Sequence, residues 1–462
     1  MPLATLDWLL VGLYFGAVAL VGYLKHEQAT EEIDFLLSGR KLTLPAFVAT
    51  LVSTWYGGIL GVGEFSYLYG VSMWTVLGLP FYFFSFIYAV ILAPRIRAHP
   101  ALSIPEALSM QYGKRAGLAA APLVFVLVSP APYILMLALL FQYLTGSTAP
   151  FLLYAVAVAL FSMAYVAVGG FGAVVRTDVL QLVLMYAGFG FLLFVAVGKV
   201  ADFSTLWHAL PEAHRSLKGS HSWQYLIVWF FIALWTFVDP AFHQRVAAAR
   251  SPQVARRGIL ISIVCWMIFD IMTLLSGLYG YYLLPSLEQP AMVYPHLATR
   301  LLPVGIRGLF FVALLATIMS TLDSYLFLSG QTLGRDFLAH FFRRMPRIRL
   351  TRIATVIATL LGILLLVLYP SVIQLWYVIG SIMVPGLLLP VLGVYLPVFR
   401  IPRRFILWAL LLPPAGALVW LFMGSATGGE GAFLGVEPFY PGLAISLGIW
   451  FWSWRQRVRA SV

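Results

Sequence analysis

Long apolar stretches alternate with short polar segments along the whole chain. Thirteen of them are long enough to cross a bilayer as helices, which takes about 20 mostly apolar residues. They cover residues 6–24, 46–70, 73–93, 117–143, 150–168, 177–198, 223–240, 258–284, 306–330, 353–369, 373–398, 405–423 and 438–454. The pattern therefore predicts an all-α polytopic membrane protein with about 13 transmembrane helices.

Composition and charge agree with this class. The 462 residues are 61% hydrophobic and only 10% charged, against about 25% charged in soluble domains. The net charge of +12 on its own suggests a nucleic-acid partner, but topology explains it better. If the N-terminus lies outside, only five of the 29 Lys and Arg residues fall in outer loops: Lys199, Arg215, Lys218, Arg300 and Arg307. This bias predicts a plasma (inner) membrane protein with an outer N-terminus and a cytoplasmic C-terminus.

Catalytic and redox motifs are missing from the sequence. It shows no metal-ligand spacing, nucleophile elbow, phosphate loop or dinucleotide fingerprint. The single cysteine, Cys265, lies in an apolar stretch and has no internal partner for a disulfide. We therefore expect neither an enzyme nor a nucleic-acid-binding protein, and we expect the lipid bilayer and a small solute as partners.

Two of the predicted spans are interrupted. The second contains a cluster of glycines in mid-membrane, at Gly57, Gly58, Gly61 and Gly63, and clustered glycine weakens a helix. In the seventh, Pro240 removes a backbone donor and disfavours helix at Asp239. Backbone carbonyls freed at such breaks can coordinate cations where they line a cavity.

The spacing of these breaks suggests an internal repeat. Spans 2–6 and spans 7–11 each begin with an interrupted helix, and sets of five helices have opposite orientations in the membrane. Interrupted segments at matching positions are typical of inverted-repeat transporters with a midplane site, although glycines in helix packing are the alternative. The predicted units are a peripheral segment (1–45), two five-helix repeats (46–200 and 201–400) and a peripheral pair of helices with a short tail (401–462).

A polar stripe runs along the ninth span. Thr317, Ser320, Thr321 and Ser324 follow helical spacing on one face, with Asp323 beside them. Hydroxyls and a carboxylate are costly in lipid unless they face protein, water or an ion. Oxygen ligands of this kind suit a hard cation.

Four segments resemble a known family. They are residues 35–42 (FLLSGRKL), 169–181 (GGFGAVVRTDVLQ), 243–249 (HQRVAAA) and 316–324 (ATIMSTLDS), with GRD at 334–336. In this order they resemble the sodium:solute symporters, which include sodium/glucose, sodium/proline and sodium/sialic acid carriers. The resemblance implies a LeuT-type 5+5 inverted repeat and alternating access coupled to Na⁺.

The resemblance also implies ion sites. The shared Na⁺ site of the family maps onto the carbonyls of Ser53, Tyr56 and Thr317 and the hydroxyls of Ser320 and Thr321. A second Na⁺ site, present in some members, maps onto Asp178, Ser320, Asp323 and Ser324. A proton on one of these acids, or an ion pair of Asp178 with Arg176, is the alternative to the second ion.

The substrate pocket is expected beside the two breaks. Its candidate residues are Trp55, Ile59, Leu60, Tyr133, Gln142, Trp235, Phe237, Asp239, Gln374, Trp376 and Tyr377. Large aromatic side chains in apolar helices also occur in plain packing contacts, which is the alternative for each of them. Ile59 and Leu60 replace the polar groups of the sodium/glucose type, so a sugar is disfavoured. We expect a small carboxylate, an amino acid or a vitamin-like solute, its carboxylate held by a half-helix N-terminus.

The resulting functional hypothesis is Na⁺-coupled symport of a small organic solute. One alternative is proton-coupled symport on the same fold. The other is a transporter-like sensory receptor, which is disfavoured because only Arg455–Val462 follow the last span. A monomer is compatible with the sequence. Two further intramembrane acids, Glu64 and Asp270, receive no assigned role, and His243–Arg245 are expected to cap the inner end of the seventh span.

Overall fold

The computed structural model describes residues 3–23, 31–147, 149–200, 202–368, 372–426 and 433–460. Within these ranges the fold is helical, and β-structure is confined to two isolated bridges. The same ranges contain 10 helices long and apolar enough to cross a membrane, together with the shorter apolar helices Thr5–Val21 and Phe151–Ala164. The all-α polytopic class is therefore confirmed, whereas the total of thirteen spans stays a prediction.

The first half of the chain forms ten α-helices within the described residues. They are α1 (Thr5–Tyr23), α2 (Glu32–Leu37), α3 (Leu44–Trp55), α4 (Ile59–Tyr69), α5 (Leu79–Ile87), α6 (Ala93–Ala98), α7 (Ile104–Tyr112), α8 (Lys114–Leu127), α9 (Ala131–Thr145) and α10 (Phe151–Val197). The fourth predicted span is divided at Val128–Pro130, where Pro130 and Pro132 remove backbone donors. The fifth and sixth are joined in α10 across a kink at Gly170.

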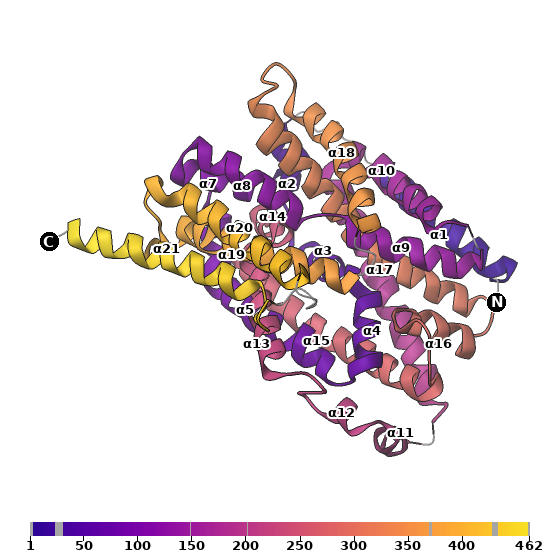
Figure 1. The fold of residues 1–462 in the computed structure, drawn as a ribbon. Helices are drawn as coiled ribbons and strands as arrows, with labels where there is room; N and C mark the ends of the chain where they lie inside the picture. Colours follow the sequence, from indigo (N-terminus) through magenta and orange to yellow (C-terminus); the bar gives the residue numbers. More distant parts are fainter. Residues whose placement is uncertain are drawn as a thin grey trace.

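The second half follows a similar sequence of elements. It contains α11 (Phe203–Ala209), α12 (Glu212–Arg215), α13 (Trp223–Ile232), α14 (Pro240–Ala248), α15 (Pro252–Leu283), α16 (Val293–Leu301), α17 (Ile306–Gly330), α18 (Arg347–Leu368), α19 (Val372–Tyr395), α20 (Ile406–Ala426) and α21 (Phe439–Ala460). The short helices α7 and α16 lie toward opposite ends of the molecule (Figure 1). The predicted domain boundaries stay a prediction, and the one after residue 45 falls inside α3.

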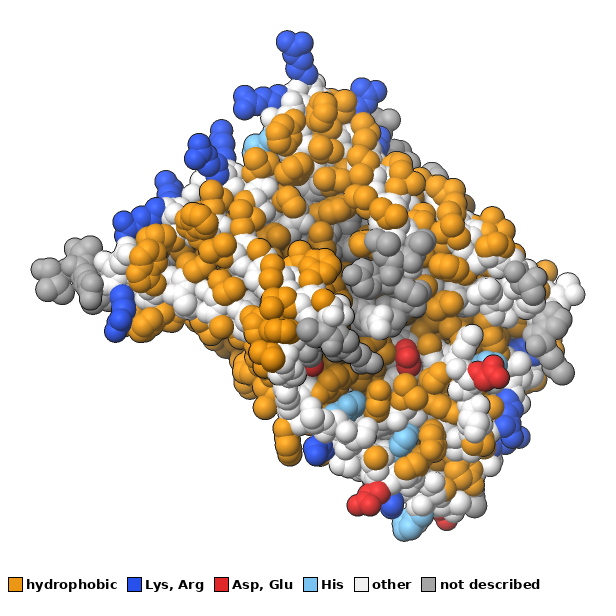
Figure 2. Space-filling model, in the orientation of Figure 1, with side chains coloured by type: hydrophobic (Ala, Val, Ile, Leu, Met, Phe, Trp, Pro, Cys, Tyr) orange, Lys and Arg blue, Asp and Glu red, His pale blue; other side chains and the backbone are white. Residues whose placement is uncertain are grey.

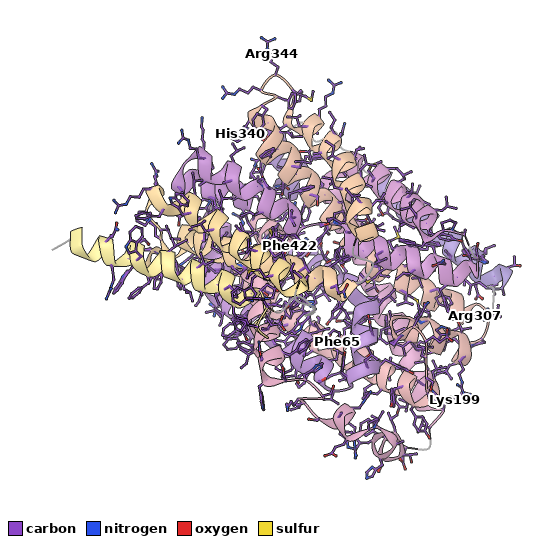
Figure 3. The ribbon with its side chains drawn as sticks, in the orientation of Figure 1. Phe65, Lys199, Arg307, His340, Arg344 and Phe422 are labelled. Carbon is purple, nitrogen blue, oxygen red and sulfur yellow. The ribbon has the colours of Figure 1, made fainter. Side chains whose placement is uncertain are left out.

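Lys and Arg side chains on the surface gather toward the ends of the helices (Figure 2). In Figure 2, Lys and Arg side chains gather at the upper and left margins, and hydrophobic side chains cover much of the surface between the ends. Arg344 and Lys199 mark opposite ends (Figure 3). An apolar surface belt between polar ends is what a bilayer requires of a polytopic protein.

The first predicted break is present between α3 and α4. A 3-10 turn (Tyr56–Gly58) separates the two helices, and Tyr56 has φ −90° and ψ 15°, outside the α-helical range. A Cβ on Gly57 would overlap the Thr321 side chain, and one on Gly58 would overlap the Trp376 ring. Glycine is required here because the turn packs closely against α17 on one side and α19 on the other.

The second break separates α13 from α14. A 3-10 turn (Ala233–Phe237) ends α13, and α14 begins at Pro240 with Asp239 as its N-cap. Proline is well suited to the first position of a helix because the missing donor has no intrahelical partner there. The sequence therefore predicted both breaks, although Gly61 and Gly63 of the first glycine cluster lie within α4 rather than in the turn.

Helix α17 lies at the centre of the bundle. All but one of its residues from Arg307 to Gly330 are buried, and it packs against α10, α1, α18 and α3. This burial places the polar stripe of the ninth predicted span inside protein rather than in lipid.

Candidate functional site

The first break and the polar stripe are in direct contact. The Thr321 hydroxyl donates a hydrogen bond to the backbone oxygen of Thr54 at 2.6 Å, two residues before the 3-10 segment. Thr54 Oγ1 lies 3.5 Å from Ser320 Oγ and 3.2 Å from Ser324 Oγ. The end of α3 and the hydroxyl-bearing face of α17 thus form one buried polar layer.

The five residues predicted for the shared Na⁺ site lie on these two elements and are all buried. The hydroxyls of Ser53 and Thr317 donate to carbonyls of their own helices, at 2.8 and 2.7 Å. The Tyr56 side chain points away from α17 and donates to the backbone oxygen of Trp266 at 2.8 Å. The Thr54 carbonyl next to the helix break thus faces the Thr321 hydroxyl of α17, and oxygen groups of this kind are suited to Na⁺.

The predicted second site is also assembled from two helices. Asp178 on α10 accepts hydrogen bonds from Ser320 Oγ at 2.5 Å and from the Thr50 hydroxyl. Asp178, Asp323 and Ser324 are all buried. The structure thus brings Asp178 together with Ser320, from positions far apart in the chain, and an ion bound at Asp178, Ser320, Asp323 and Ser324 stays a prediction.

A buried arginine lies inside this cluster. Arg245 on α14 has no solvent exposure, and its Nη2 lies 3.5 Å from an Asp178 carboxylate oxygen. The same nitrogen donates to Thr54 Oγ1 at 2.6 Å and to Ser324 Oγ at 2.8 Å, and Nε donates to the backbone oxygen of Thr50 at 3.2 Å.

One sequence expectation is corrected by this arginine. Arg245 does not cap the inner end of α14 but points into the bundle, because Asp178 and three hydroxyls compensate its charge there. Asp178 forms an ion pair with Arg245, a partner that the sequence did not predict.

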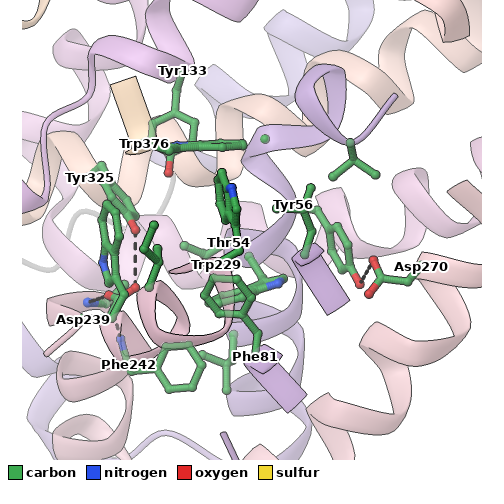
Figure 4. A pocket seen from close by; sticks show the side chains of 18 residues that line it. Thr54, Tyr56, Phe81, Tyr133, Trp229, Asp239, Phe242, Asp270, Tyr325 and Trp376 are labelled. Atoms are coloured by element: carbon green, nitrogen blue, oxygen red, sulfur yellow. Dashed lines mark hydrogen bonds between the residues drawn. The ribbon is translucent and has the colours of Figure 1, made fainter. Parts of the chain in front are cut away.

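A cavity of about 130 Å³ lies beside both breaks. For comparison, dry cavities of about 150 Å³ in other proteins accept benzene. Its 18 lining residues are drawn in Figure 4 and include nine aromatic side chains. The aromatic members are Trp55, Tyr56, Phe81, Tyr133, Trp229, Trp235, Phe242, Tyr325 and Trp376. Thr54 also lines this cavity, so the cavity and the polar layer share a residue.

Five of the eleven predicted substrate residues line the cavity: Trp55, Tyr133, Trp235, Asp239 and Trp376. The other six lie elsewhere. Ile59 and Leu60 are buried in packing contacts, and Phe237 packs against Phe84 and Tyr88, with ring centroids 5.6 and 6.4 Å apart.

The remaining three are at the periphery or part-buried. Gln142 donates to the backbone oxygen of Ala149 at the end of α9, Gln374 is exposed on α19, and Tyr377 is partly buried against the core. Sequence reasoning missed Phe81, Trp229, Phe242 and Tyr325, which carry no local signal because aromatic side chains are common in every apolar helix.

Two carboxylates border the cavity. Asp239 accepts hydrogen bonds from the backbone nitrogens of Ala241 and Phe242, at 2.6 and 3.4 Å, and lies 3.4 Å from the Tyr325 hydroxyl. Asp270 on α15 accepts a hydrogen bond from Tyr56 at 3.0 Å.

Asp270 also accepts one from Tyr82, so the acid that lacked an assigned role now has two tyrosine partners. Glu64, the other unassigned acid, is half-buried on α4.

Comparison with known proteins supports a transporter. The family model described as "Sodium:solute symporter family" matches residues 35–409. The chain is 25% identical to the osmoregulated proline transporter OpuE of Bacillus subtilis, covering 95% of this chain and 92% of that protein. It is 26% identical to the sodium/proline symporter of Haemophilus influenzae, covering 72% and 70%.

Solved structures agree on the fold. A Na⁺-coupled sialic acid symporter in a substrate-bound outward-open state superposes with a TM-score of 0.78, at 16% identity and 97% coverage of both chains. The inward-facing conformation of Mhp1 gives a TM-score of 0.56, at 14% identity, covering 90% of this chain and 91% of that one. The predicted LeuT-type fold and an integral membrane protein are thereby confirmed.

Proposed function

Because the chain belongs to the sodium:solute symporter family, we propose that it carries a small organic solute across the membrane together with Na⁺. The observation that carries this proposal is the position of Thr54. Its backbone oxygen accepts a hydrogen bond from Thr321 in the predicted ion site, and Thr54 also lines the aromatic cavity. An ion and a solute bound on either side of one residue at a helix break are positioned to stabilise each other's binding.

The proposed Na⁺ ligands are the carbonyls of Ser53, Tyr56 and Thr317 and the hydroxyls of Ser320 and Thr321. Bound Na⁺ would replace the Thr321–Thr54 hydrogen bond by ion–oxygen contacts and hold α3 against α17. Release of the ion would free the break, which is the element that alternating access requires to move.

We infer a coupling ratio of one Na⁺ per cycle. The Arg245 guanidinium already places a positive charge beside Asp178 and Ser324. A second Na⁺ at Asp178, Asp323 and Ser324 stays a prediction, and it requires Arg245 to withdraw from this cluster. The positive-inside pattern supports a plasma membrane location with an outer N-terminus.

The test is thermal stability of the purified protein in NaCl against KCl at matched ionic strength. A ligand that binds only the folded state stabilises it by about 2.7 kcal/mol at 100 times its Kd. We expect NaCl to raise the melting temperature of the wild type but not of the Ser320→Ala/Thr321→Ala variant. The matched control is Thr355→Ala/Thr359→Ala, which removes two buried hydroxyls that donate within α18 and should retain the sodium response.

Proton coupling is the rival on the same fold. It predicts that NaCl leaves the melting temperature of the wild type unchanged at every concentration, while the melting temperature follows pH through Asp178 or Asp323. That result would refute the Na⁺ proposal and leave the cavity as the solute site.

A further inference from the structure

Both charged side chains that line the cavity, Asp239 and Asp270, are negative. Among its lining residues, all of them described by the structure, two are carboxylates and none is Lys, Arg or His. Asp239 and Asp270 lie on opposite sides of the aromatic side chains in Figure 4. An anionic group entering this space would meet no basic side chain and two acids.

A helix N-terminus is the usual substitute for a basic side chain, because its free backbone N–H groups bind anions. At the N-terminus of α14, the side chain of Asp239 already occupies this anion-binding position. The Asp239 carboxylate accepts the hydrogen bonds of the first free N–H groups of α14 at 2.6 and 3.4 Å. The N-terminus of α14 therefore has no donor left for the solute carboxylate that the sequence predicts at a half-helix N-terminus.

Asp270 is the acid best placed to act on a solute. It is 5% exposed, lines the cavity, and its hydrogen bonds come from two uncharged tyrosine hydroxyls. None of the ion pairs among the described residues includes Asp270, whereas Asp178 has Arg245. A buried carboxylate without a cationic partner gains most from a ligand that brings a positive charge.

The aromatic walls favour the same ligand. Ring faces attract cations within about 6 Å of the centroid, and aromatic cages are how proteins recognise quaternary ammonium groups. The rings are held by one another: Trp55 packs against Phe81 and Phe242 with centroids 5.0 and 5.6 Å apart, and Tyr133 against Tyr325 at 4.9 Å. A rigid cage loses little entropy when a ligand binds.

We propose that the transported solute is a small organic cation, an alkylammonium or quaternary ammonium ion, held by the aromatic rings and balanced by Asp270. The inference rests on the proposed symport function and narrows its solute class. A zwitterion would place its carboxylate beside two acids, and an anion would lose both the cage and the counter-charge.

The experiment compares four probes of nearly equal shape in NaCl. They are choline, its neutral carbon isostere 3,3-dimethylbutan-1-ol, the zwitterion glycine betaine and the anion 3,3-dimethylbutanoate. Binding is read from the melting temperature and from quenching of tryptophan fluorescence, since four tryptophans line the cavity. We expect choline to bind at millimolar concentration or tighter, and at least about tenfold more tightly than each other probe.

Two variants test whether choline binding depends on Asp270. Asp270→Asn keeps the shape and should weaken choline binding by about tenfold or more while leaving the neutral isostere unchanged. Glu64→Gln removes a second intramembrane acid that does not line the cavity, and it should bind choline as the wild type does.

The inference is overturned if the zwitterion or the anion binds best, if the neutral isostere equals choline, if no choline response appears at millimolar concentration, or if Asp270→Asn binds choline normally. The sodium response of the same wild-type sample distinguishes a failure of the inferred solute class from a failure of the proposed symport function. With that response intact, these results refute only the solute class, whereas its loss refutes the proposed symport itself.

Discussion

Replacing Arg245 with methionine should destabilise the protein strongly. Methionine keeps the apolar stem but removes the guanidinium, so Asp178 keeps Ser320 and Thr50 as donors and loses its positive partner. Both side chains have no solvent exposure, so water cannot replace the lost charge. Removing one partner of a buried ion pair costs about 3–5 kcal/mol, because the other charge remains uncompensated.

The second partner provides the decisive comparison. Asp178→Asn alone leaves the guanidinium buried and should cost a similar amount. The Arg245→Met/Asp178→Asn double variant removes both charges and should recover most of the loss, since replacing a buried pair by uncharged groups is often close to neutral. The coupling energy from this cycle should be at least about 2 kcal/mol.

The assay is unfolding in mixed detergent micelles, followed by loss of near-ultraviolet circular dichroism. Arg250→Met is the matched control because this arginine is exposed at the end of α14, and its loss should change the unfolding free energy by less than about 0.5 kcal/mol. A loss below about 1 kcal/mol for Arg245→Met, or a double variant no more stable than the singles, would show that the two charges are not coupled.

Three further perturbations test other parts of the structure. Gly57→Ala forces α3 away from α17 and should abolish the sodium-induced rise in melting temperature, whereas Gly12→Ala, which meets no neighbouring atom, should preserve it. Arg307→Met leaves the buried Asp7 without the partner at 2.6 Å and should lower the unfolding free energy by about 3 kcal/mol in the same micelle assay. Burial lowers the pKa of His99 below its ordinary 6.5, and its Nδ1 faces a backbone N–H at 3.2 Å, so the folded state prefers the neutral ring. Stability should therefore fall as the pH drops below about 6.5, and His99→Gln should reduce this fall in melting curves at pH 7.5 and 5.5; an equal fall in both proteins would exclude this histidine as the cause.

Local chemistry explains what the sequence could predict. The breaks at Gly57 and Pro240 follow from conformational rules that act within a few residues. The stripe from Thr317 to Ser324 follows from helical spacing alone. These features indicate the predicted ion site and one side of the cavity without any knowledge of tertiary contacts.

The partners that the sequence did not predict depend on contacts between distant segments. Arg245 follows Pro240 by five residues, and topology alone places it at the membrane edge. Its contacts with Asp178, 67 positions away in the chain, and with the hydroxyls of Thr54 and Ser324 draw it inward. Asp270 likewise receives hydrogen bonds from tyrosines 188 and 214 positions away, and no local pattern predicts such partners.

The Arg245–Asp178 pair also has an electrical consequence. A bound ion that crosses the membrane field gains about 2.3 kcal/mol per elementary charge at 100 mV. A guanidinium and a carboxylate that stay together carry no net charge, so the membrane voltage does no work on them in either direction of the cycle. The net charge moved per complete cycle then belongs to the transported ions: in the proposed cycle, one Na⁺ with an organic cation would move two charges inward per turnover, and recordings of transport current would count them directly.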